Sequence, residues 1–232
     1  KIGLAMILDT QSIIITLGFL QGSSHLISPE KIKLFLNHRS LRIRNKILSI
    51  IEHSGEKIFL DDIFTNLAKP TTNAKAEKAL LSYSIKLLKS NFTQRLNPTL
   101  SSFQLRIAII KFMQNNPNKS WLEILIKILK DPDLIILNTV CDALISISKS
   151  FEIKQQYLDK IDEDFQHLAQ QAFQLHKFKE DLENDLDTTL IHDHIDSDLD
   201  KITPVLLKLG TLDEPEIPIE TYISYYKKRR IN

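Results

Sequence analysis

The sequence predicts an all-α fold, a right-handed α-solenoid of about four helical hairpins with an atypical helical C-terminal cap. Leu, Ile and Lys dominate the composition, which favours helices. Gly is scarce, with 5 residues in 232, whereas sandwiches and barrels use glycine in tight turns. An apolar-basic dipeptide also recurs every 31 residues, at Ile43-Arg44, Ala74-Lys75 and Leu105-Arg106. A fixed period of this kind predicts hairpins that bury their apolar faces against their neighbours.

The first segment, residues 1–27, is apolar and is expected to be helical. Residues 2–20 are nearly long enough to cross a bilayer, but Asp9 and the polar residues after it lie in the middle. A charge at the centre of a bilayer is costly, so we expect a buried first helix, or two short helices broken near Asp9 and Thr10. Because the chain begins with Lys1 and not Met, we interpret it as part of a longer or processed protein, with a membrane tether upstream of Lys1 as an alternative.

The repeats are placed at residues 28–150, and the clearest hairpin spans 120–148. Its first half has apolar residues at the spacing of an amphipathic helix, and Asp131-Pro132-Asp133 then breaks that helix. Pro132 suits the first turn of a second helix, and Asp133 adds negative charge near the start of that helix. Stepping back by the period predicts hairpin units at 28–54, 57–89, 92–116 and 118–148. The second unit is the poorest match, with Ala74, Leu81 and Ile85 on its second-helix stripe.

The C-terminal part is predicted to contain an acidic helical cap at 151–210, followed by a linker and a basic tail helix at 211–232. Apolar stripes are spaced as in helices, and Gly210 is the expected helix stop. The linker occupies 211–218 and the tail helix 219–230. Residues 1–150 contain 20 Lys and Arg against 11 Asp and Glu, a net charge of +9, whereas residues 151–232 have 10 against 18, a net of −8. This asymmetry bears on the partners of the chain more than on its fold.

The unit around 131–147 resembles a HEAT repeat, whose second helix begins with Asp-Pro-Asp and continues with Val-Arg and Ala-Leu. Asp131-Pro132-Asp133, Ile136 and Ala143-Leu144 match this pattern without a gap, whereas Leu137 stands where the family usually has Arg. The short period is closest to the bacterial HEAT-like type. More weakly, the HEAT-like units and acidic helices together resemble the soluble region of bacterial transporters related to nucleotide translocases.

Five basic residues form the candidate binding set: Arg39, Arg42, Arg44, Lys75 and Arg106. The resemblance implies that second helices line the concave face of the stack, so these residues would form a basic stripe there. Such a stripe can bind phosphates or an acidic partner. The resemblance also implies the competing interpretation, which we favour, that the basic residue of each repeat ties adjacent repeats together. The break at Leu137 then marks the end of the regular stack.

The remaining acidic, histidine, cysteine and tryptophan residues that could take part in catalysis or binding are expected to have structural roles. His192–Asp198 contains two histidines and three aspartates, but side chains two residues apart on a helix diverge, so we expect a solvated acidic face. The same applies to Asp61-Asp62 and to Asp162-Glu163-Asp164, because adjacent carboxylates do not face one cleft. Cys141 is expected to be a buried, inert thiol and Trp121 a packing residue. No catalytic residue, metal ligand or cofactor is predicted.

The predicted function is that of a non-catalytic helical-repeat module for protein–protein interaction or scaffolding, a regulatory part of a larger protein in the cytoplasm. The partner is expected to be a protein. One alternative is a nucleic-acid-binding HEAT-like protein that uses the basic stripe. The other is the cytosolic domain of a membrane transporter.

Overall fold

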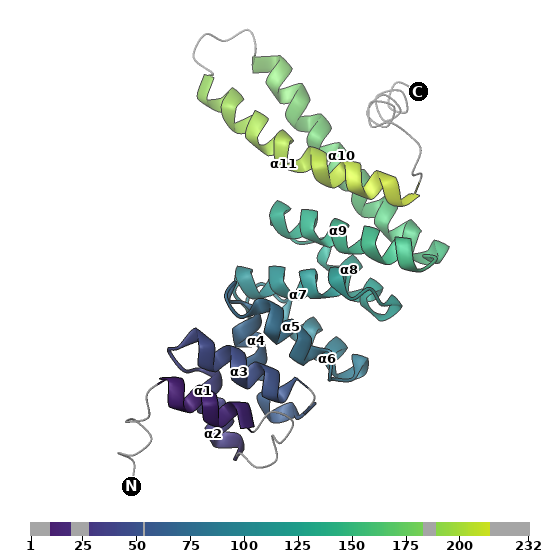
Figure 1. Ribbon diagram of the computed structural model, residues 1–232. Coiled ribbons are helices and arrows are strands. Elements are labelled where there is room, and N and C mark those ends of the chain that lie inside the picture. Colours follow the sequence, from purple (N-terminus) through teal and green to yellow (C-terminus); the bar gives the residue numbers. More distant parts are fainter. Residues whose placement is uncertain (1–9, 20–27, 53, 183–188, 214–232) are drawn as a thin grey trace. The chain divides into compact units, whose positions relative to one another are not determined.

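The computed structural model is all-α over the part of the chain that it describes, which confirms the predicted fold class (Figure 1). The described residues are 10–19, 28–52, 54–182 and 189–213. The predicted tail helix at 219–230 and most of the linker before it lie outside them. The chain divides into two compact units, Lys1–Phe112 and Met113–Asn232, and each unit is described by itself.

The helices of the first unit are short. They are α1 (Thr10–Phe19), α2 (Pro29–Leu36), α3 (Leu41–Ile51), η3 (Lys57–Phe59), α4 (Leu60–Leu67), α5 (Asn73–Leu80), α6 (Ile85–Arg95) and most of α7 (Phe103–Asn115). The second unit begins with the short helices η4 (Lys119–Trp121) and α8 (Leu122–Ile128). Its remaining described helices are longer, and they are α9 (Leu134–Ser150), α10 (Gln155–Leu182) and α11 (Thr189–Asp213).

The apolar N-terminal segment contains one described helix, α1, which begins at Thr10 and packs against α3. Ile13 and Leu17 lie one turn apart and are buried, whereas Ile15 between them is 53% exposed. The described residues therefore contain a partly buried helix from Thr10, and the choice between one helix and two helices broken near Asp9 and Thr10 falls on residues 1–9, which lie outside the described ranges. Among the described helices, none combines the length and the apolar character that a membrane crossing requires.

The 31-residue period places its dipeptides in four successive second helices, namely α3, α5, α7 and α9. The predicted boundary between the second and third units is wrong, however, because α5 ends at Leu80 and α6 begins at Ile85. Leu81 and Ile85 are exposed, whereas Ala76, Ala79 and Leu80 form the buried face of α5. Ser84 explains the early start of α6, since its hydroxyl accepts a hydrogen bond from Leu87 N and caps the helix.

An aromatic ladder forms the core of the first unit between α4, α6 and α7. Phe64, Phe92 and Phe112 are all buried. The ring of Phe92 meets the other two edge to face, with centroids 5.8 Å from Phe64 and 5.5 Å from Phe112. Edge-to-face pairs of this kind add about 1 kcal/mol each beyond the burial of their area. The ladder therefore joins three helices that are far apart in sequence.

The turn between α8 and α9 is held by acidic side chains. Asp133 is the N-cap of α9, and its Oδ1 accepts hydrogen bonds from Ile135 N at 2.9 Å and Ile136 N at 3.2 Å. Asp131 Oδ1 accepts from Asp133 N at 3.0 Å. Pro132 thus lies just before the helix and not in its first turn, because Asp133 already fills the capping position.

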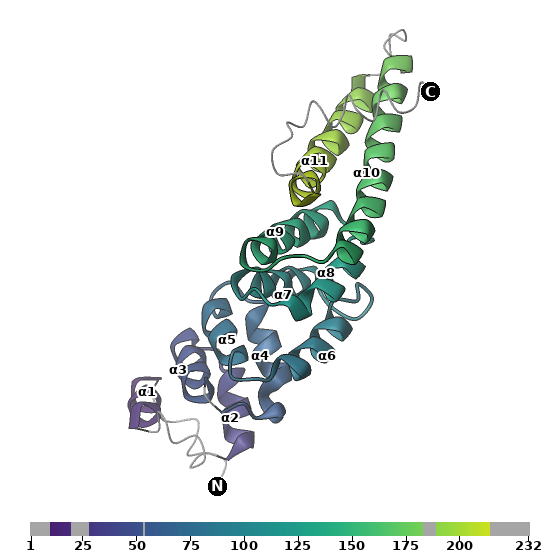
Figure 2. The ribbon, with the colours of Figure 1, turned by 90° about the vertical axis from the view of Figure 1, so that its right-hand side faces the viewer.

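The last two helices, α10 and α11, pack side by side and are antiparallel (Figure 1). Lys179 Nζ of α10 lies 2.5 and 2.7 Å from the carboxylate oxygens of Asp196 in α11. Figure 2 shows the C-terminal end of α11 next to α9, where Lys208 Nζ binds Asp142 at 2.6 Å and Asn138 at 2.7 Å. The predicted stop at Gly210 is wrong, since α11 continues to Asp213 and Gly210 is buried within it.

Candidate functional site

Arg44, a member of the predicted basic set, binds the turn that precedes its own helix. Its Nη1 donates to the carbonyl oxygens of His38 at 2.7 Å and of Arg39 at 3.1 Å. Both carbonyls belong to the turn between α2 and α3, so the guanidinium closes its own hairpin. Within the described residues, the buried Nε of Arg44 has no hydrogen-bond partner.

Arg106 occupies the corresponding position in α7 and makes the corresponding bond. It is buried, with 5% of its surface exposed, and its Nε donates to Leu96 O at 3.2 Å. Leu96 is the C-cap of α6, the first helix of the same hairpin. A charged donor on an otherwise unpaired helix-end carbonyl is a strong stabilising contact.

The prediction that the repeat's basic residue ties adjacent hairpins is therefore wrong for Arg44, whose guanidinium is used within its own hairpin. The links between hairpins of the first unit come from other residues. Asn66 Nδ2 donates to Leu36 O at 3.1 Å, which joins α4 to the end of α2. Arg95 of α6 pairs with Asp61 of α4.

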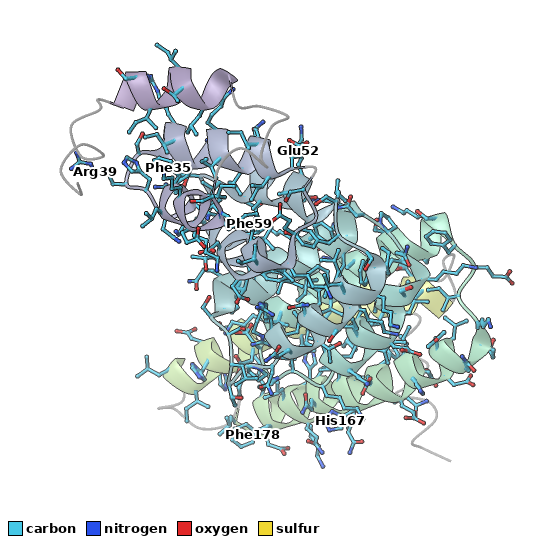
Figure 3. All side chains as sticks on the ribbon, turned by 90° about the horizontal axis from the view of Figure 1, so that it is seen from below. Phe35, Arg39, Glu52, Phe59, His167 and Phe178 are labelled. Atoms are coloured by element: carbon cyan, nitrogen blue, oxygen red, sulfur yellow. The ribbon has the colours of Figure 1, made fainter. Side chains whose placement is uncertain are left out.

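The remaining members of the basic set lie in different environments. Arg42 and Arg39 are exposed, and Arg39 projects away from the helices of its unit (Figure 3). Lys75 is half-buried in α5. In this hairpin the carbonyls at the end of α4 accept from side chains of Thr72 and Asn73, each at 2.7 Å. A binding role for Arg39, Arg42 and Lys75 stays a prediction.

In the α8–α9 hairpin of the second unit, Leu137 occupies the position of Arg44 and Arg106, and a groove of about 660 Å³ lies there. The groove lies between the α8–α9 turn and the middle of α10. Its apolar lining comes from Leu129, Pro132, Leu134, Leu137 and Leu168. Its polar lining comes from Lys130, Asp131, Glu163, Asp164, His167 and Gln171. A volume of this size is within the range of about 300–1,000 Å³ that is typical of ligand pockets.

The groove is acidic, because three carboxylates line it against a single lysine. Burial raises the pKa of Asp164, and the neighbouring Glu163 raises it further, while Lys130 and His167 lower it. Burial disfavours the charged form of the carboxyl, and the opposing effects of Lys130 and His167 compensate for it only in part. His167 projects from α10 and is exposed, which places it at the rim of the groove (Figure 3).

The acidic cluster on α11 is distributed between separate ion pairs. Asp196 pairs with Lys179, and Asp198 pairs with Lys201 at 3.2 Å. The first of these acids therefore joins two helices, which differs from the purely solvated face that was expected. In the described ranges, no group of three or more His, Cys, Asp and Glu side chains is placed to hold a metal ion.

Two further expectations on single residues are confirmed. Trp121 is buried in the second unit, and its indole Nε1 donates to Asn116 O at 3.0 Å, so it is a packing residue. Cys141 is fully buried, and burial raises the pKa of its thiol to about 12. At neutral pH the thiol is therefore protonated, which is the form that does not attack electrophiles.

Sequence reasoning missed the groove because its two sides are separated in the chain by more than twenty residues. The signal that marks its position was present in the substitution of Leu137 for the repeat's basic residue. Comparison with protein-family models, with curated proteins and with solved structures found no match.

Proposed function

We propose that this chain is a non-catalytic helical-repeat module that binds another protein, as a regulatory part of a larger protein. The observation that carries the proposal is the acidic groove of the second unit, located where Leu137 replaces the repeat's arginine. An interaction module needs a concave surface with an apolar floor and a few polar groups that set specificity. The groove combines these two properties.

The HEAT-like interpretation of the fold is part of the proposal. It is supported by Arg44 and Arg106, which stand at the same register position and both donate to carbonyls of the preceding turn. Equivalent residues with equivalent contacts are typical of repeated units. We propose that the hairpins from α2 to α9 are such units, arranged as a solenoid, and that α10 and α11 form its cap.

The chemistry of the groove indicates its ligand. Pro132 is exposed and Leu134 is half-buried, so these two residues offer apolar surface against which burial of an apolar side chain is favourable, whereas Leu129, Leu137 and Leu168 are themselves buried. Glu163 is exposed and Asp164 is half-buried on α10, and with Asp131 they outnumber the one lysine of the groove, so they attract cationic groups. A peptide segment that combines apolar side chains with Lys or Arg matches both features.

A nucleic-acid ligand fits these observations less well. Phosphates would be repelled by the carboxylates of the groove. In the first unit, Arg44 and Arg106 already bind backbone carbonyls, which leaves Arg42 and Arg39 as the exposed members of the basic set. We therefore expect duplex DNA to bind weakly, with an affinity that Arg42→Ala leaves unchanged in fluorescence anisotropy at two salt concentrations. A loss of salt-dependent binding in that variant would favour the nucleic-acid alternative.

The test of the proposed function is a selection of random peptides on the full chain. We expect the selected peptides to contain Lys or Arg next to apolar residues, and to bind about tenfold more weakly to Glu163→Lys. Asp200→Lys on α11 is the matched control, because Asp200 is exposed and does not line the groove. If the selected peptides lack this composition, or if Glu163→Lys and Asp200→Lys bind them equally, the proposal is wrong.

The proposed binding module leaves open which kind of larger protein contains it. A cytosolic domain of a membrane transporter stays an alternative setting for the same binding module. The coding sequence upstream of Lys1 decides between the two settings, since a transporter would have several membrane-spanning segments there.

A further inference from the structure

Glu163 and Asp164, the carboxylates that α10 contributes to the groove, have a counterpart in the sequence of the same chain. Residues 219–230 contain Lys227, Lys228, Arg229 and Arg230 against one acidic residue, Glu220. The apolar and aromatic residues that precede these cations are Ile219, Tyr222, Ile223, Tyr225 and Tyr226. This combination of apolar and cationic side chains is the one that the groove is suited to bind.

The chain also connects this segment to the groove at short range. Lys208 of α11 binds Asn138 of α9, which is the neighbour of the groove residue Leu137. From Asp213, the last residue of α11, to Lys227 the chain has 14 residues, enough to reach about 50 Å when fully extended. A short tether of this kind gives an effective concentration in the millimolar range, so even a weak ligand would occupy the groove.

We propose that residues 219–230 bind in the groove between the α8–α9 turn and α10, and that a partner must displace them. In this proposal the cations at 227–230 bind Glu163 and Asp164, and the preceding aromatic residues pack on Pro132 and Leu134. The proposal rests on the proposed function, because the segment occupies the same site as the partner. In this proposal the tail is an internal competitor that lowers the apparent affinity of the groove for its partner.

The direct test is zero-length cross-linking of the full chain with a carbodiimide, which joins a lysine amine to a carboxylate in contact with it. We expect Lys227 or Lys228 to be joined to Glu163, Asp164 or Asp131, as identified by mass spectrometry. The double variant Glu163→Gln, Asp164→Asn should lose most of these products, whereas Asp200→Asn should not. Mixing isotopically labelled and unlabelled chains separates links within one chain from links between copies.

Cross-links from the tail lysines that favour Asp200 or other control carboxylates as strongly as the groove would overturn the proposal. Links that form only between copies would overturn it too. A second measurement uses Lys227→Gln, Lys228→Gln, Arg229→Gln and Arg230→Gln together, with a selected peptide as the probe. If the tail occupies the groove nine-tenths of the time, its neutralisation tightens peptide binding about tenfold.

The two proposals can fail independently. Peptides that bind the wild type and the tail-neutralised variant equally well, with no groove cross-link, contradict the tail proposal and support the binding module. Groove cross-links from the tail, with no external peptide able to bind even the tail-neutralised variant, contradict the binding module and support the intramolecular contact.

Discussion

The turn of the α6–α7 hairpin and the turn of the α8–α9 hairpin are stabilised by different residues. In the first, Arg106 fills the space beside the turn and donates to the carbonyl of Leu96. In the second, Leu137 stands at the same register position, and Asp131 and Asp133 organise the turn by accepting from backbone N–H groups. The first turn is closed by a side chain, while the second has a groove beside it.

The difference teaches that, if the hairpins are repeats as proposed, the candidate site lies where the arginine of the repeat position is absent. An arginine that is bonded to its own turn occupies space and uses its charge internally. Replacing it with leucine removes the charge and the reach of the side chain, while the caps at Asp131 and Asp133 keep the turn in place. The space beside the turn, together with the carboxylates of α10, is then available for a ligand.

The largest expected effect is that of Arg106→Ala. The substitution removes a buried guanidinium and leaves the carbonyl of Leu96 without this donor, which should cost about 3 kcal/mol of unfolding free energy. The measurement is urea unfolding followed by circular dichroism. A change below about 1 kcal/mol would show that the bond does not hold the α6–α7 turn.

Arg44→Ala should have a smaller effect, about 1–2 kcal/mol, because this arginine is only half-buried and its Nε already lacks a partner. Arg42→Ala is the matched control on the same helix, since its side chain is exposed, and its effect should stay within about 0.5 kcal/mol. Equal effects of the two substitutions in urea unfolding would contradict the comparison between turn-binding and exposed arginines.

The smallest effect is expected from Asp164→Asn in the groove. Because the pKa of Asp164 is raised above 3.8 in the folded chain, the folded state binds its proton more tightly than the unfolded state. The resulting stabilisation is present below pH 3.8 and is lost as the pH rises through the folded pKa. Asparagine removes this dependence, so the variant should be slightly more stable at pH 7, by less than about 1 kcal/mol because solvent screens the half-exposed group.

Because the proposed contact with the tail cations would itself lower the pKa of Asp164, the test uses the chain in which Lys227, Lys228, Arg229 and Arg230 are replaced by Gln. Unfolding midpoints of that chain with and without Asp164→Asn between pH 3 and pH 7 should separate as the pH rises. Glu163→Gln is an informative companion, because removing the neighbouring negative charge lowers the pKa of Asp164 and should raise stability at neutral pH in the same direction. Curves that separate toward acid pH would reverse the assigned sign and contradict the raised pKa.

The sequence pattern predicted the all-α class and the register of α3, α7 and α9, because the buried side chains of Ile47, Ile109 and Val140 keep the 31-residue period. It misplaced the boundary between α5 and α6, because the cap at Ser84 and the exposed Leu81 depend on local hydrogen bonding that periodicity does not report. It favoured Arg44 as a tie between adjacent repeats, whereas the guanidinium of Arg44 binds the turn of its own hairpin.

The site was harder to predict than the fold. The carboxylates at 162–164 were interpreted as a solvated face, which holds for a helix in isolation. In the folded chain α10 packs beside the turn at 129–134, so Glu163 and Asp164 line a groove. This contact joins segments that are far apart in sequence. No periodic pattern encodes that contact, so the groove became visible only in three dimensions.

The most direct test of the central claim is the affinity of a selected peptide for Leu137→Arg. The substitution restores the residue type found at this position in α3 and α7, so the side chain should reach the α8–α9 turn and fill the groove. We predict a folded chain by circular dichroism, unchanged binding in the conservative control Leu137→Met, and a loss of about tenfold or more in Leu137→Arg. An unchanged peptide affinity in a folded Leu137→Arg chain would contradict the account.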